Sequence, residues 1–432
     1  MPKILDQPRY KCALAAMQTV HAISKALPIL HSGPGCADKL SATQGGSGHF
    51  APRIFPCTNI NEKDVVFGGE ERLKETVENA IKIINADLYV VLSSCSSEII
   101  GDDMEEVVRS FRNAEKPVVF ASTAGFKGNN FQGHEWVIEA IIEQYLKPTD
   151  KKTKGLVNIW AGIPQHDPFW YGNLFELENL IAQLGLIPNT IFGYDRGIKN
   201  IDKIPEAEFN LLVSPWVGLR NVKLLEEKFG TPYIHLPTLP IGAFETGKFL
   251  RAVAEFAGID KETVEGIITE QEKKYYYFIE RFADVFLETR VMSKRFVVIS
   301  DAQYSLAITK FLVNDVGLFP SKQYITDNTP EEYQESIQGY FKELNYDIKA
   351  EVGFISDGHL IQDEIKESYF SGYPLIIGSS WDKKLAQQTQ AHYLSVSWPL
   401  NERLVINSSY VGYGGGLKLL EDIYSVVLTR FN

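Results

Sequence analysis

Cysteine is scarce in this sequence, and none follows Cys95. The four cysteines, Cys12, Cys36, Cys57 and Cys95, all lie in the first quarter of the 432-residue chain. Structural disulfides are rare in a reducing cytosol, so we expect these residues to be free thiols. Their confinement to one segment indicates one local site, although free cysteines can also be small buried hydrophobic residues.

Long apolar runs and an excess of positive charge are also missing. No stretch approaches the roughly 20 unbroken apolar residues that span a bilayer, and the N-terminus has no apolar signal core or cleavage site. With 43 Lys and Arg against 55 Asp and Glu, the formal charge is −12, which argues against nucleic acid or an anionic membrane as a partner. We therefore expect a cytoplasmic protein.

The chain, long enough for two to four domains, divides at two polar stretches, one near residue 150 and one near residue 290. The apolar run after each stretch, Leu156–Trp160 and Phe296–Ser300, is typical of a buried strand and precedes a loop and an amphipathic helix. Each helix ends in glycine and then proline, and a second strand is expected near Thr190–Phe192 and Gln323–Ile325. A β-α-β unit therefore occurs twice, as at the opening of a doubly wound parallel sheet.

The first part of the chain has strands and helices of its own. Strands are predicted at Pro28–His31, Leu88–Leu92 and Pro117–Ala121, and helices at Glu71–Ile84 and Asp102–Phe111. The fold class predicted for the whole chain is α/β, with three doubly wound, Rossmann-like parallel-sheet domains. The predicted limits are residues 1–150 for a cluster-binding domain, 151–288 for a second domain and 289–432 for a third.

Three of the cysteines lie where a loop meets a predicted helix. Cys95 follows a strand, Cys36 follows the segment His31-Ser-Gly-Pro-Gly, and Cys12 opens the helical run Ala13–Ile23. Free N–H groups at a helix start favour the thiolate, which is the form that binds metals, and such loops gather at one edge of a parallel sheet. We predict that Cys12, Cys36 and Cys95 bind an iron–sulfur cluster. Zinc is the competing interpretation, but no C-x-x-C pair occurs.

The fourth cysteine is not a predicted ligand, so the chain supplies three thiolates. Cys57, in Phe55-Pro-Cys-Thr-Asn59, has no comparable context and is expected to be a packed or peripheral thiol. Three thiolates cannot complete the four-cysteine set of even one four-iron cluster. A matching face on a second subunit is therefore expected.

Several segments of the chain form a recognisable set. They are Lys11-Cys12-Ala13, Gly33-Pro-Gly-Cys36, Cys95-x-x-Glu98-Ile-Ile-Gly-Asp-Asp103, Ser397-Trp-Pro-Leu-Asn-Glu-Arg403 and Val411-Gly-Tyr-Gly-Gly-Gly-Leu417. The first three resemble the cluster-ligand segments of the component 1 proteins of nitrogenase and its relatives, and the last two resemble the end of the β-type chain. The separations between the three cysteines are also closer to those of the β-type chain, and the resemblance spans essentially the whole sequence.

This resemblance implies an oxidoreductase, namely the β-type subunit of a nitrogenase or nitrogenase-like reductase. The implied cofactor is an iron–sulfur cluster, of the [8Fe-7S] P-cluster or [4Fe-4S] type, at the interface with an α-type chain. The α-type chain would hold the metallocluster at which dinitrogen or a similar small substrate is reduced. The resemblance assigns no catalytic residue to this chain, and two αβ pairs would form an α₂β₂ heterotetramer. The runner-up is a subunit of a cofactor-assembly scaffold, and a distant third is a metal-free binding or regulatory protein.

An ATP-dependent [4Fe-4S] iron protein is the implied electron donor. The segment Asn61-Glu-Lys-Asp-Val-Val-Phe-Gly-Gly69 is similar to the family's docking surface for that protein, and Phe67 matches its exposed aromatic residue. We expect Phe67 to anchor the donor, with steering charge from the acidic residues beside it. These are Glu62, Asp64, Glu70 and Glu71.

Three departures from the family pattern matter. The α-type chain holds its metallocluster through a downstream Cys and His, and no Cys follows residue 95 here. Gly125 occupies the place where some β-type chains carry a Ser that ligates the oxidised cluster. The long N-terminal extension of the molybdenum-type β subunit is absent, which favours an alternative or divergent member.

Three other features receive structural interpretations. His31 is a candidate hydrogen-bond donor close to the cluster. The segment Gly412-Tyr-Gly-Gly-Gly416 lacks the Lys-Ser/Thr of a phosphate loop and is expected to be a tight packing turn. The aromatic helix predicted over Glu270–Phe286 is expected to pack between domains or subunits.

Overall fold

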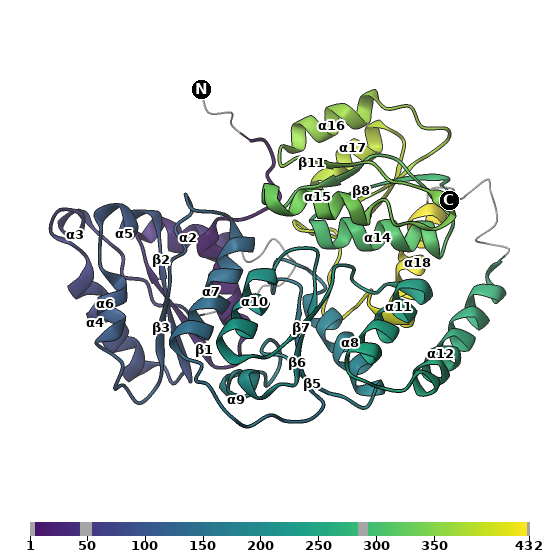
Figure 1. Ribbon diagram of the computed structural model, residues 1–432. Helices are drawn as coiled ribbons and strands as arrows, with labels where there is room; N and C mark the ends of the chain where they lie inside the picture. The colour runs from purple at the N-terminus through teal and green to yellow at the C-terminus, as the bar shows by residue number, and fades with distance from the viewer. Residues whose placement is uncertain (1–4, 44–53, 284–292, 430–432) are drawn as a thin grey trace.

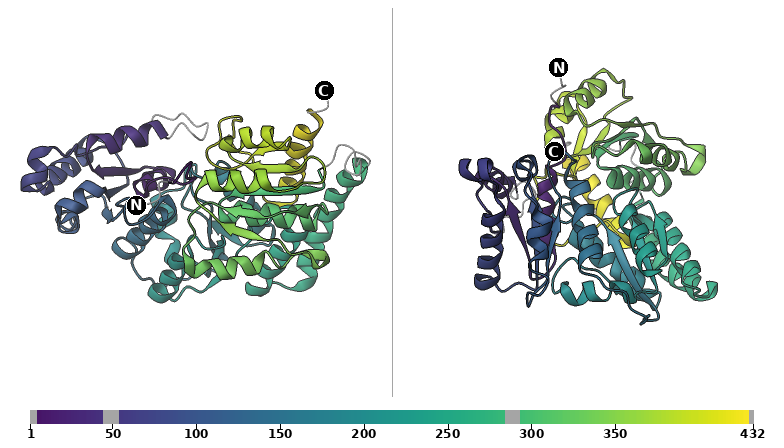
Figure 2. Two further views of the ribbon diagram at one scale, coloured as in Figure 1. Left: turned by 90° about the horizontal axis from the view of Figure 1, so that it is seen from above. Right: turned by 60° about the vertical axis from the view of Figure 1, so that its left-hand side comes forward.

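The computed structural model describes residues 5–43, 54–283 and 293–429, and three parallel β-sheets with flanking helices account for its architecture (Figure 1). Each sheet is built from one successive part of the chain. The part that carries the first sheet projects to one side of the other two (Figure 2). The predicted α/β class with three doubly wound sheets is confirmed.

The first sheet has the strand order β1–β2–β3, with β1 at Ala26–His31, β2 at Leu88–Ser93 and β3 at Val118–Ala121. His31 pairs with Ser93, so β1 and β2 end level with one another. The helical elements of this part are η1 Ala13–Ala16, α1 Met17–Ala22, α2 Pro34–Thr43, α3 Glu62–Phe67, α4 Glu70–Ile83, α5 Cys95–Ile100, α6 Met104–Arg109 and α7 Asn130–Gln144.

Both faces of the first sheet are covered, because its strands are apolar on both sides. Leu27 and Ile29 of β1 face a cluster that contains the apolar residues of α4 and α6. Leu30 of β1 instead joins a second cluster, which includes η1, α1 and α7. A sheet buried on both faces reads as a continuous apolar run, which is why these strands were predictable.

The second sheet has the order β5–β4–β6–β7, and the third has the order β11–β10–β8–β12–β13 with β9 beside β8. The elements of the second part are β4 Leu156–Ala161, α8 Trp170–Gln183, β5 Ile187–Asn189, α9 Ile198–Asp202, η3 Ile204–Glu206, β6 Phe209–Val213, α10 Leu219–Phe229, β7 Tyr233–Leu236, α11 Gly242–Phe256 and α12 Lys261–Arg281. Those of the third part are β8 Arg295–Ser300, α14 Ala302–Asn314, β9 Phe319–Pro320, β10 Gln323–Ile325, α15 Glu331–Tyr340, η4 Asn345–Asp347, β11 Val352–Phe354, α16 Gly358–Glu367, β12 Leu375–Gly378, η5 Ser380–Asp382, α17 Lys383–Gln388, β13 His392–Ser395 and α18 Gly412–Thr429.

One continuous apolar core joins the three parts of the chain and includes residues of α7, α8, α11, α14 and α18. A buried ion pair adds a polar connection, since Arg9 Nη1 and Nη2 each donate to an oxygen of Asp382 at 2.7 Å. Arg9 lies just before Cys12, and Asp382 ends η5 in the third part. Among the described residues, no helix has the length and apolar character needed to cross a membrane.

Most predicted elements are confirmed, and the second-part strand predicted at Thr190–Phe192 was wrong. The strand is β5, Ile187–Asn189, and it contains Pro188. The sequence pattern assigns this proline to a helix stop signal, but β5 lies at the edge of its sheet, where proline is tolerated. The predicted boundary at residue 288 lies outside the described residues, so the domain limits stay a prediction.

The structure also tests the predictions for the glycine-rich segment 412–416 and for the aromatic helix. The segment Gly412–Gly416 is the first part of helix α18 and not the predicted turn, but tight packing is confirmed, because a Cβ on Gly415 would collide with the backbone of Tyr410. On α12, Tyr275 is buried and packs edge-on against Tyr413 of α18. Tyr276, Tyr277 and Phe278 remain about half exposed, so packing is confirmed for Tyr275 alone.

Candidate metal centre

The three cysteines predicted as ligands all lie at helix starts. Cys12 is the N-cap residue of η1, Cys36 is the third residue of α2, and Cys95 is the first residue of α5. The loops that carry Cys36 and Cys95 leave the carboxyl ends of β1 and β2, which are neighbours in the sheet. Cys12 reaches the same edge through an isolated antiparallel bridge to Asn129, which follows β3. Strand order therefore brings the three segments together, as the sequence predicts.

Gly125 shows how close two of the sulfurs lie. A Cβ placed on Gly125 would be 2.6 Å from Sγ of Cys12 and 3.4 Å from Sγ of Cys95. Any side chain at this position would have to displace the Cys12 thiol. Gly125 is thus in contact with two of the predicted ligands and has no side chain that could bind a metal.

The thiols face outwards and influence one another. Cys12 and Cys36 are exposed, and Cys95 is half-buried. Partial burial raises the pKa of Cys12, and the negative charge of a Cys95 thiolate raises it further. The pKa of Cys36 is raised by partial burial and then by the thiolates of Cys12, Cys95 and Cys57.

Helix-start amides act on Cys12 in the expected direction. Backbone N–H groups of Leu14 and Ala13 lower the pKa of Cys12, but burial outweighs them. A set of thiols that repel one another as thiolates favours a shared positive centre, because metal ions stabilise the deprotonated sulfur.

The spacing of the side chains bears on which metal group fits. Within the described ranges, no three His, Cys, Asp or Glu side chains converge tightly enough to hold a single metal ion. This disfavours the zinc interpretation, which requires ligands about one bond length from a common point. Soft thiol donors on separate loops, facing outwards, fit a larger iron–sulfur cluster with further ligands from another chain.

Cys57 differs from the other three cysteines. It lies in a segment that pairs with β1 through an isolated parallel bridge to Leu30, and it is half-buried. Its Sγ lies 3.3 Å from Oγ of Ser32, and it donates to the Ser32 carbonyl oxygen at 3.4 Å. A packed or peripheral thiol was predicted here, and neither its hydrogen bonds to Ser32 nor the strand-like pairing with β1 was.

Two charged residues close to the ligands were not predicted to be partners of the site. Glu98 of α5 accepts from Ser93 at 2.6 Å and from Ser122 at 2.5 Å, and Lys127 pairs with it at 2.5 Å. Lys11 is buried beside Cys12, where its Nζ donates to Gln18 Oε1 at 2.9 Å and to the Gln165 carbonyl at 3.2 Å. Burial lowers the pKa of Lys11 to about 7. The sequence offered one indication of these contacts, which is that Glu98 and Lys11 lie close to Cys95 and Cys12 in the chain.

His31 does not donate towards the cysteines as predicted, because both of its ring nitrogens have other partners. Its Nδ1 lies 3.0 Å from Oγ1 of Thr58, and its Nε2 lies 2.9 Å from Oδ2 of Asp102. Burial lowers the pKa of His31 despite the neighbouring carboxylate. The neutral ring therefore carries its proton on Nε2, since a carboxylate accepts and the Thr58 hydroxyl can donate to Nδ1.

Asp102 and Asp103 have separate roles, although the sequence allows either of them to cap the helix after Cys95. The Asp103 side chain accepts from Glu106 N and caps α6. Asp102 instead accepts from His31 and, at 2.8 Å, from the backbone N–H of Gly69. The short helix α5, which lies between Cys95 and these aspartates, was missed because six residues give no measurable periodicity.

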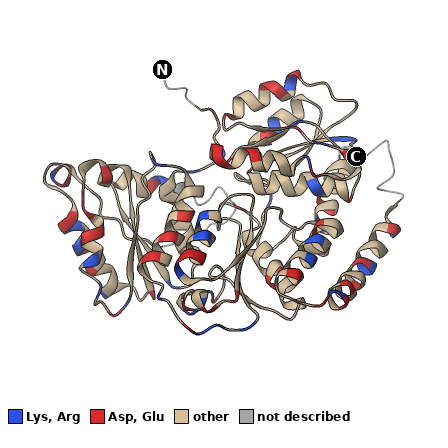
Figure 3. Ribbon diagram, viewed as in Figure 1, with Lys and Arg blue, Asp and Glu red and all other residues tan. Residues whose placement is uncertain are grey.

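The predicted docking residue lies at the surface. Phe67 is the last residue of α3 and is 80% exposed. Val65 and Val66 of α3 are also exposed, as is Ile99 of α5, the helix that contacts α3. Charges of both signs follow along α4 (Figure 3). Asp64 is not a steering charge, because it is buried, belongs to the capping box of α3 and pairs with Arg72 at 2.8 Å.

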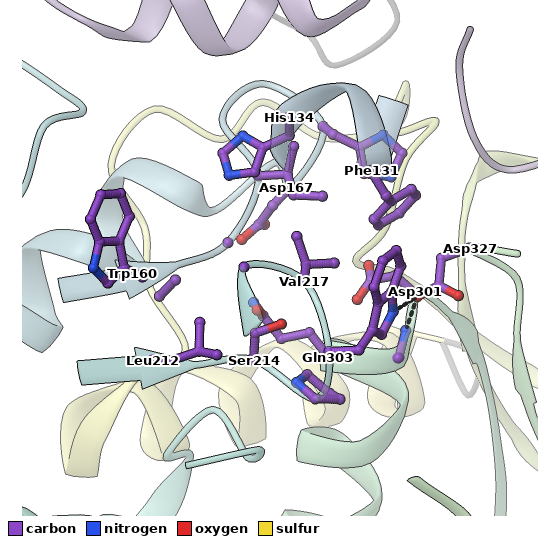
Figure 4. Close-up of a pocket in the computed structure, with 18 of the residues that line it drawn as sticks. Phe131, His134, Trp160, Asp167, Leu212, Ser214, Val217, Asp301, Gln303 and Asp327 are labelled. Carbon is purple, nitrogen blue, oxygen red and sulfur yellow. Dashed lines mark hydrogen bonds between the residues drawn. The ribbon is translucent and has the colours of Figure 1, made fainter. Parts of the chain in front are cut away.

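A cavity that no cysteine lines lies among residues of α7 and the carboxyl ends of strands in the second and third sheets (Figure 4). Aspartates and aromatic side chains line it, and the aspartates have partners in the chain. Asp327 accepts from Trp216 Nε1 at 3.1 Å, and Asp167 accepts from the Tyr304 hydroxyl at 2.7 Å. Burial raises the pKa of Asp167 to about 7 and that of Asp301 to about 6. The aspartates of this cavity are thus bonded within the chain, across the second and third parts.

Solved structures share this architecture. The structure titled "Nitrogenase Cp1 at pH 6.5" superposes with a TM-score of 0.82 at 21% sequence identity, covering 100% of this chain and 94% of the other. A second, "Nitrogenase Cp1 at pH 5", gives a TM-score of 0.74 at 18% identity. At this level of identity the likeness shows the fold.

Sequence comparisons add the family. The chain is 24% identical over 441 residues to the nitrogenase molybdenum-iron protein beta chain of Clostridium pasteurianum, covering 96% of this chain and 92% of that one. It is 26% identical over 382 residues to a light-independent protochlorophyllide reductase component of Angiopteris evecta, covering 83% and 70%. The family model for nitrogenase component 1 type oxidoreductases matches residues 12–428. The chain therefore belongs to the nitrogenase component 1 type oxidoreductase family, as a β-type chain.

Proposed function

We propose that this chain is the electron-relaying β-type subunit of a nitrogenase or nitrogenase-like reductase, and that Cys12, Cys36 and Cys95 hold an iron–sulfur cluster shared with an α-type chain. The observation that carries the proposal is the placement of three thiols along one edge of the first sheet, where Cys12 and Cys95 both lie against Gly125 and exposed Cys36 follows β1. When bound, a cluster of the [8Fe-7S] or [4Fe-4S] type would accept and release electrons at this edge.

The residues around the thiols support a face that meets another protein. Cys12 and Cys36 are exposed, as is Phe126 at 60%, next to Gly125. Thiols open to water would leave a cluster labile, whereas an apolar partner surface would exclude water and supply the missing ligands. Two αβ pairs would then associate into the α₂β₂ heterotetramer.

In this proposal, other chains donate the electrons and reduce the substrate. An ATP-dependent [4Fe-4S] iron protein docks on α3, where Phe67 is the exposed anchor. The substrate, dinitrogen or a similar small molecule, is reduced at a metallocluster on the α-type chain. The protein acts in the cytoplasm, where reduced thiols and low-potential donors persist.

Cysteine variants of the co-expressed αβ complex test the proposal. Cys95→Ala, and likewise Cys12→Ala and Cys36→Ala, should strip iron from the complex and abolish donor-dependent turnover. Cys57→Ala is the matched control and should retain both, because the Cys57 thiol is already bonded to Ser32. Iron content and donor-dependent reduction are measured anaerobically. Equal iron loss in the Cys57 and Cys95 variants would contradict the ligand set, and iron retention without donor-dependent reduction would favour an assembly scaffold.

A further inference from the structure

The docking helix α3 is held at both ends by segments that carry the predicted cluster ligands. On its entry side, residues 56–60 run beside β1: Thr58 N donates to the Leu30 carbonyl at 3.0 Å, and Ile60 N donates to the Ser32 carbonyl at 3.0 Å. On its exit side, two residues after Phe67, Gly69 N donates to Asp102 at 2.8 Å. Neither end of α3 can shift without straining bonds to the loops of Cys36 and Cys95.

His31 lies where these restraints meet. Its side chain bonds Thr58 on the entry side and Asp102 on the exit side, and it is fully buried. Its backbone carbonyl accepts from the Ser94 hydroxyl at 2.8 Å, and Ser94 is the N-cap of α5. One residue therefore connects to both ends of the short helix that begins with Cys95.

The space around this network is filled. A Cβ placed on Gly69 would lie 2.8 Å from Oδ2 of Asp102 and 3.0 Å from Cε1 of His31. Close-packed interiors transmit displacement, and buried polar networks behave as units. A displacement of α3 should therefore also displace the His31–Asp102 pair.

We propose that the His31–Asp102 pair is a positioning unit that transmits docking of the electron donor at Phe67 to the helix that carries Cys95. This inference rests on the proposed function and adds residues to it. The pair is buried, and its hydrogen-bond partners are Thr58 and Gly69 and not the cysteines. Its role is to couple the geometry of α3 to that of α5, so that electron delivery responds to docking.

Two substitutions at Asp102 separate this role from simple support. Asp102→Ala removes the acceptor of both His31 and Gly69. Asp102→Asn can keep the network, because its carbonyl can accept from Gly69 while its amide donates to Nε2. His31 then moves its proton to Nδ1 and donates to Thr58, whose hydroxyl can donate to the Ser32 carbonyl. Rescue by Asn is therefore expected if the bonds matter and the charge does not.

A glycine substitution perturbs the same pair without removing either member. Gly69→Ala places a methyl group against Asp102 and His31, and the backbone φ of −104° at Gly69 is accessible to alanine. Gly339→Ala is the matched control, since a Cβ there meets nothing within 4 Å. The first should uncouple docking from delivery, and the second should have no effect.

The test uses the anaerobically purified αβ complex with its iron protein. In Asp102→Ala and Gly69→Ala, iron content and chemical reduction by dithionite should match wild type, and the KM for the iron protein should be unchanged. The rate of donor-driven reduction should fall on the order of tenfold or more, as for other displacements remote from the reacting groups. Amide hydrogen exchange gives a second readout: donor binding should slow exchange in both α3 and α5 in wild type, and in α3 alone in Asp102→Ala.

Several results would overturn the inference. They are wild-type donor-driven rates in Asp102→Ala, iron loss in Asp102→Ala comparable with that of Cys95→Ala, or failure of Asp102→Asn to rescue. The wild-type complex separates this inference from the proposed function. If wild type holds iron and is reduced by the donor while the variants behave like it, only the positioning role fails. If wild type shows no donor-driven reduction, both proposals fail.

Discussion

The edge of the first sheet and the cavity beside the second and third sheets occupy equivalent places, yet they offer different chemistry. Both lie outside the carboxyl ends of parallel strands, where ligands usually bind. At the first edge, Cys12 and Cys36 are exposed, and Gly125 has no side chain beside the sulfurs of Cys12 and Cys95. In the cavity, Asp167 and Asp327 are buried and already accept hydrogen bonds from their own chain.

This difference teaches that topology locates a candidate site, whereas unmet bonding capacity identifies one. The buried aspartates accept from Tyr304 and Trp216, so they connect the second and third parts of the chain. The thiols face outwards and repel one another as thiolates, which leaves them ready for a metal group and a partner. The following predictions test whether the two regions differ in this way.

The largest effect is expected at the Arg9–Asp382 ion pair, which joins the segment before Cys12 to the third part of the chain. Arg9→Ala leaves the Asp382 carboxylate buried without its cation, and loss of one partner of a buried pair costs about 3–5 kcal/mol in the free energy of unfolding. Chemical denaturation of the isolated chain measures this. Arg109→Ala is the control, because its pair with Glu105 is exposed. Equal destabilisation by both substitutions would show that the buried pair has no special role.

A smaller effect is expected at the docking surface. Phe67→Ala removes an exposed aromatic anchor, and loss of such an anchor typically costs about 1–2 kcal/mol or more in binding. The KM for the iron protein should rise on the order of tenfold, with iron content unchanged. Tyr369→Ala, at another highly exposed aromatic residue, is the control. If the Phe67 variant binds and accepts electrons like wild type, the donor docks elsewhere.

The smallest effect is expected in the cavity and concerns pH. Burial raises the pKa of Asp167 to about 7, against about 4 in the unfolded chain. Between these values the native state binds more protons than the unfolded state, so this residue's contribution to stability is lost as pH rises towards 7. Asp167→Asn should therefore reduce the fall in Tm between pH 5 and pH 8. An unchanged pH profile would show that Asp167 is ionised throughout.

Much of the fold, and the position of the cysteines at one edge of the first sheet, was predictable because it depends on local patterns. Strands buried on both faces read as apolar runs, and cysteines after such strands can be assigned to one sheet edge. The network at His31 was not predictable, since Thr58, Gly69 and Asp102 come from separate segments and carry no shared pattern. The pairing of Asp64 with Arg72 and the true position of β5 depend likewise on tertiary context.

Iron content of the chain purified with and without its partner tests the central claim most directly. The claim is that Cys12, Cys36 and Cys95 bind a cluster that needs ligands from an α-type chain. Purified anaerobically alone, the chain should be colourless or lose iron readily, and should self-associate through its exposed apolar face. Co-expressed with the α-type chain, it should give a stable brown complex. A lone chain that is monomeric by light scattering and holds a full, stable cluster would contradict the account.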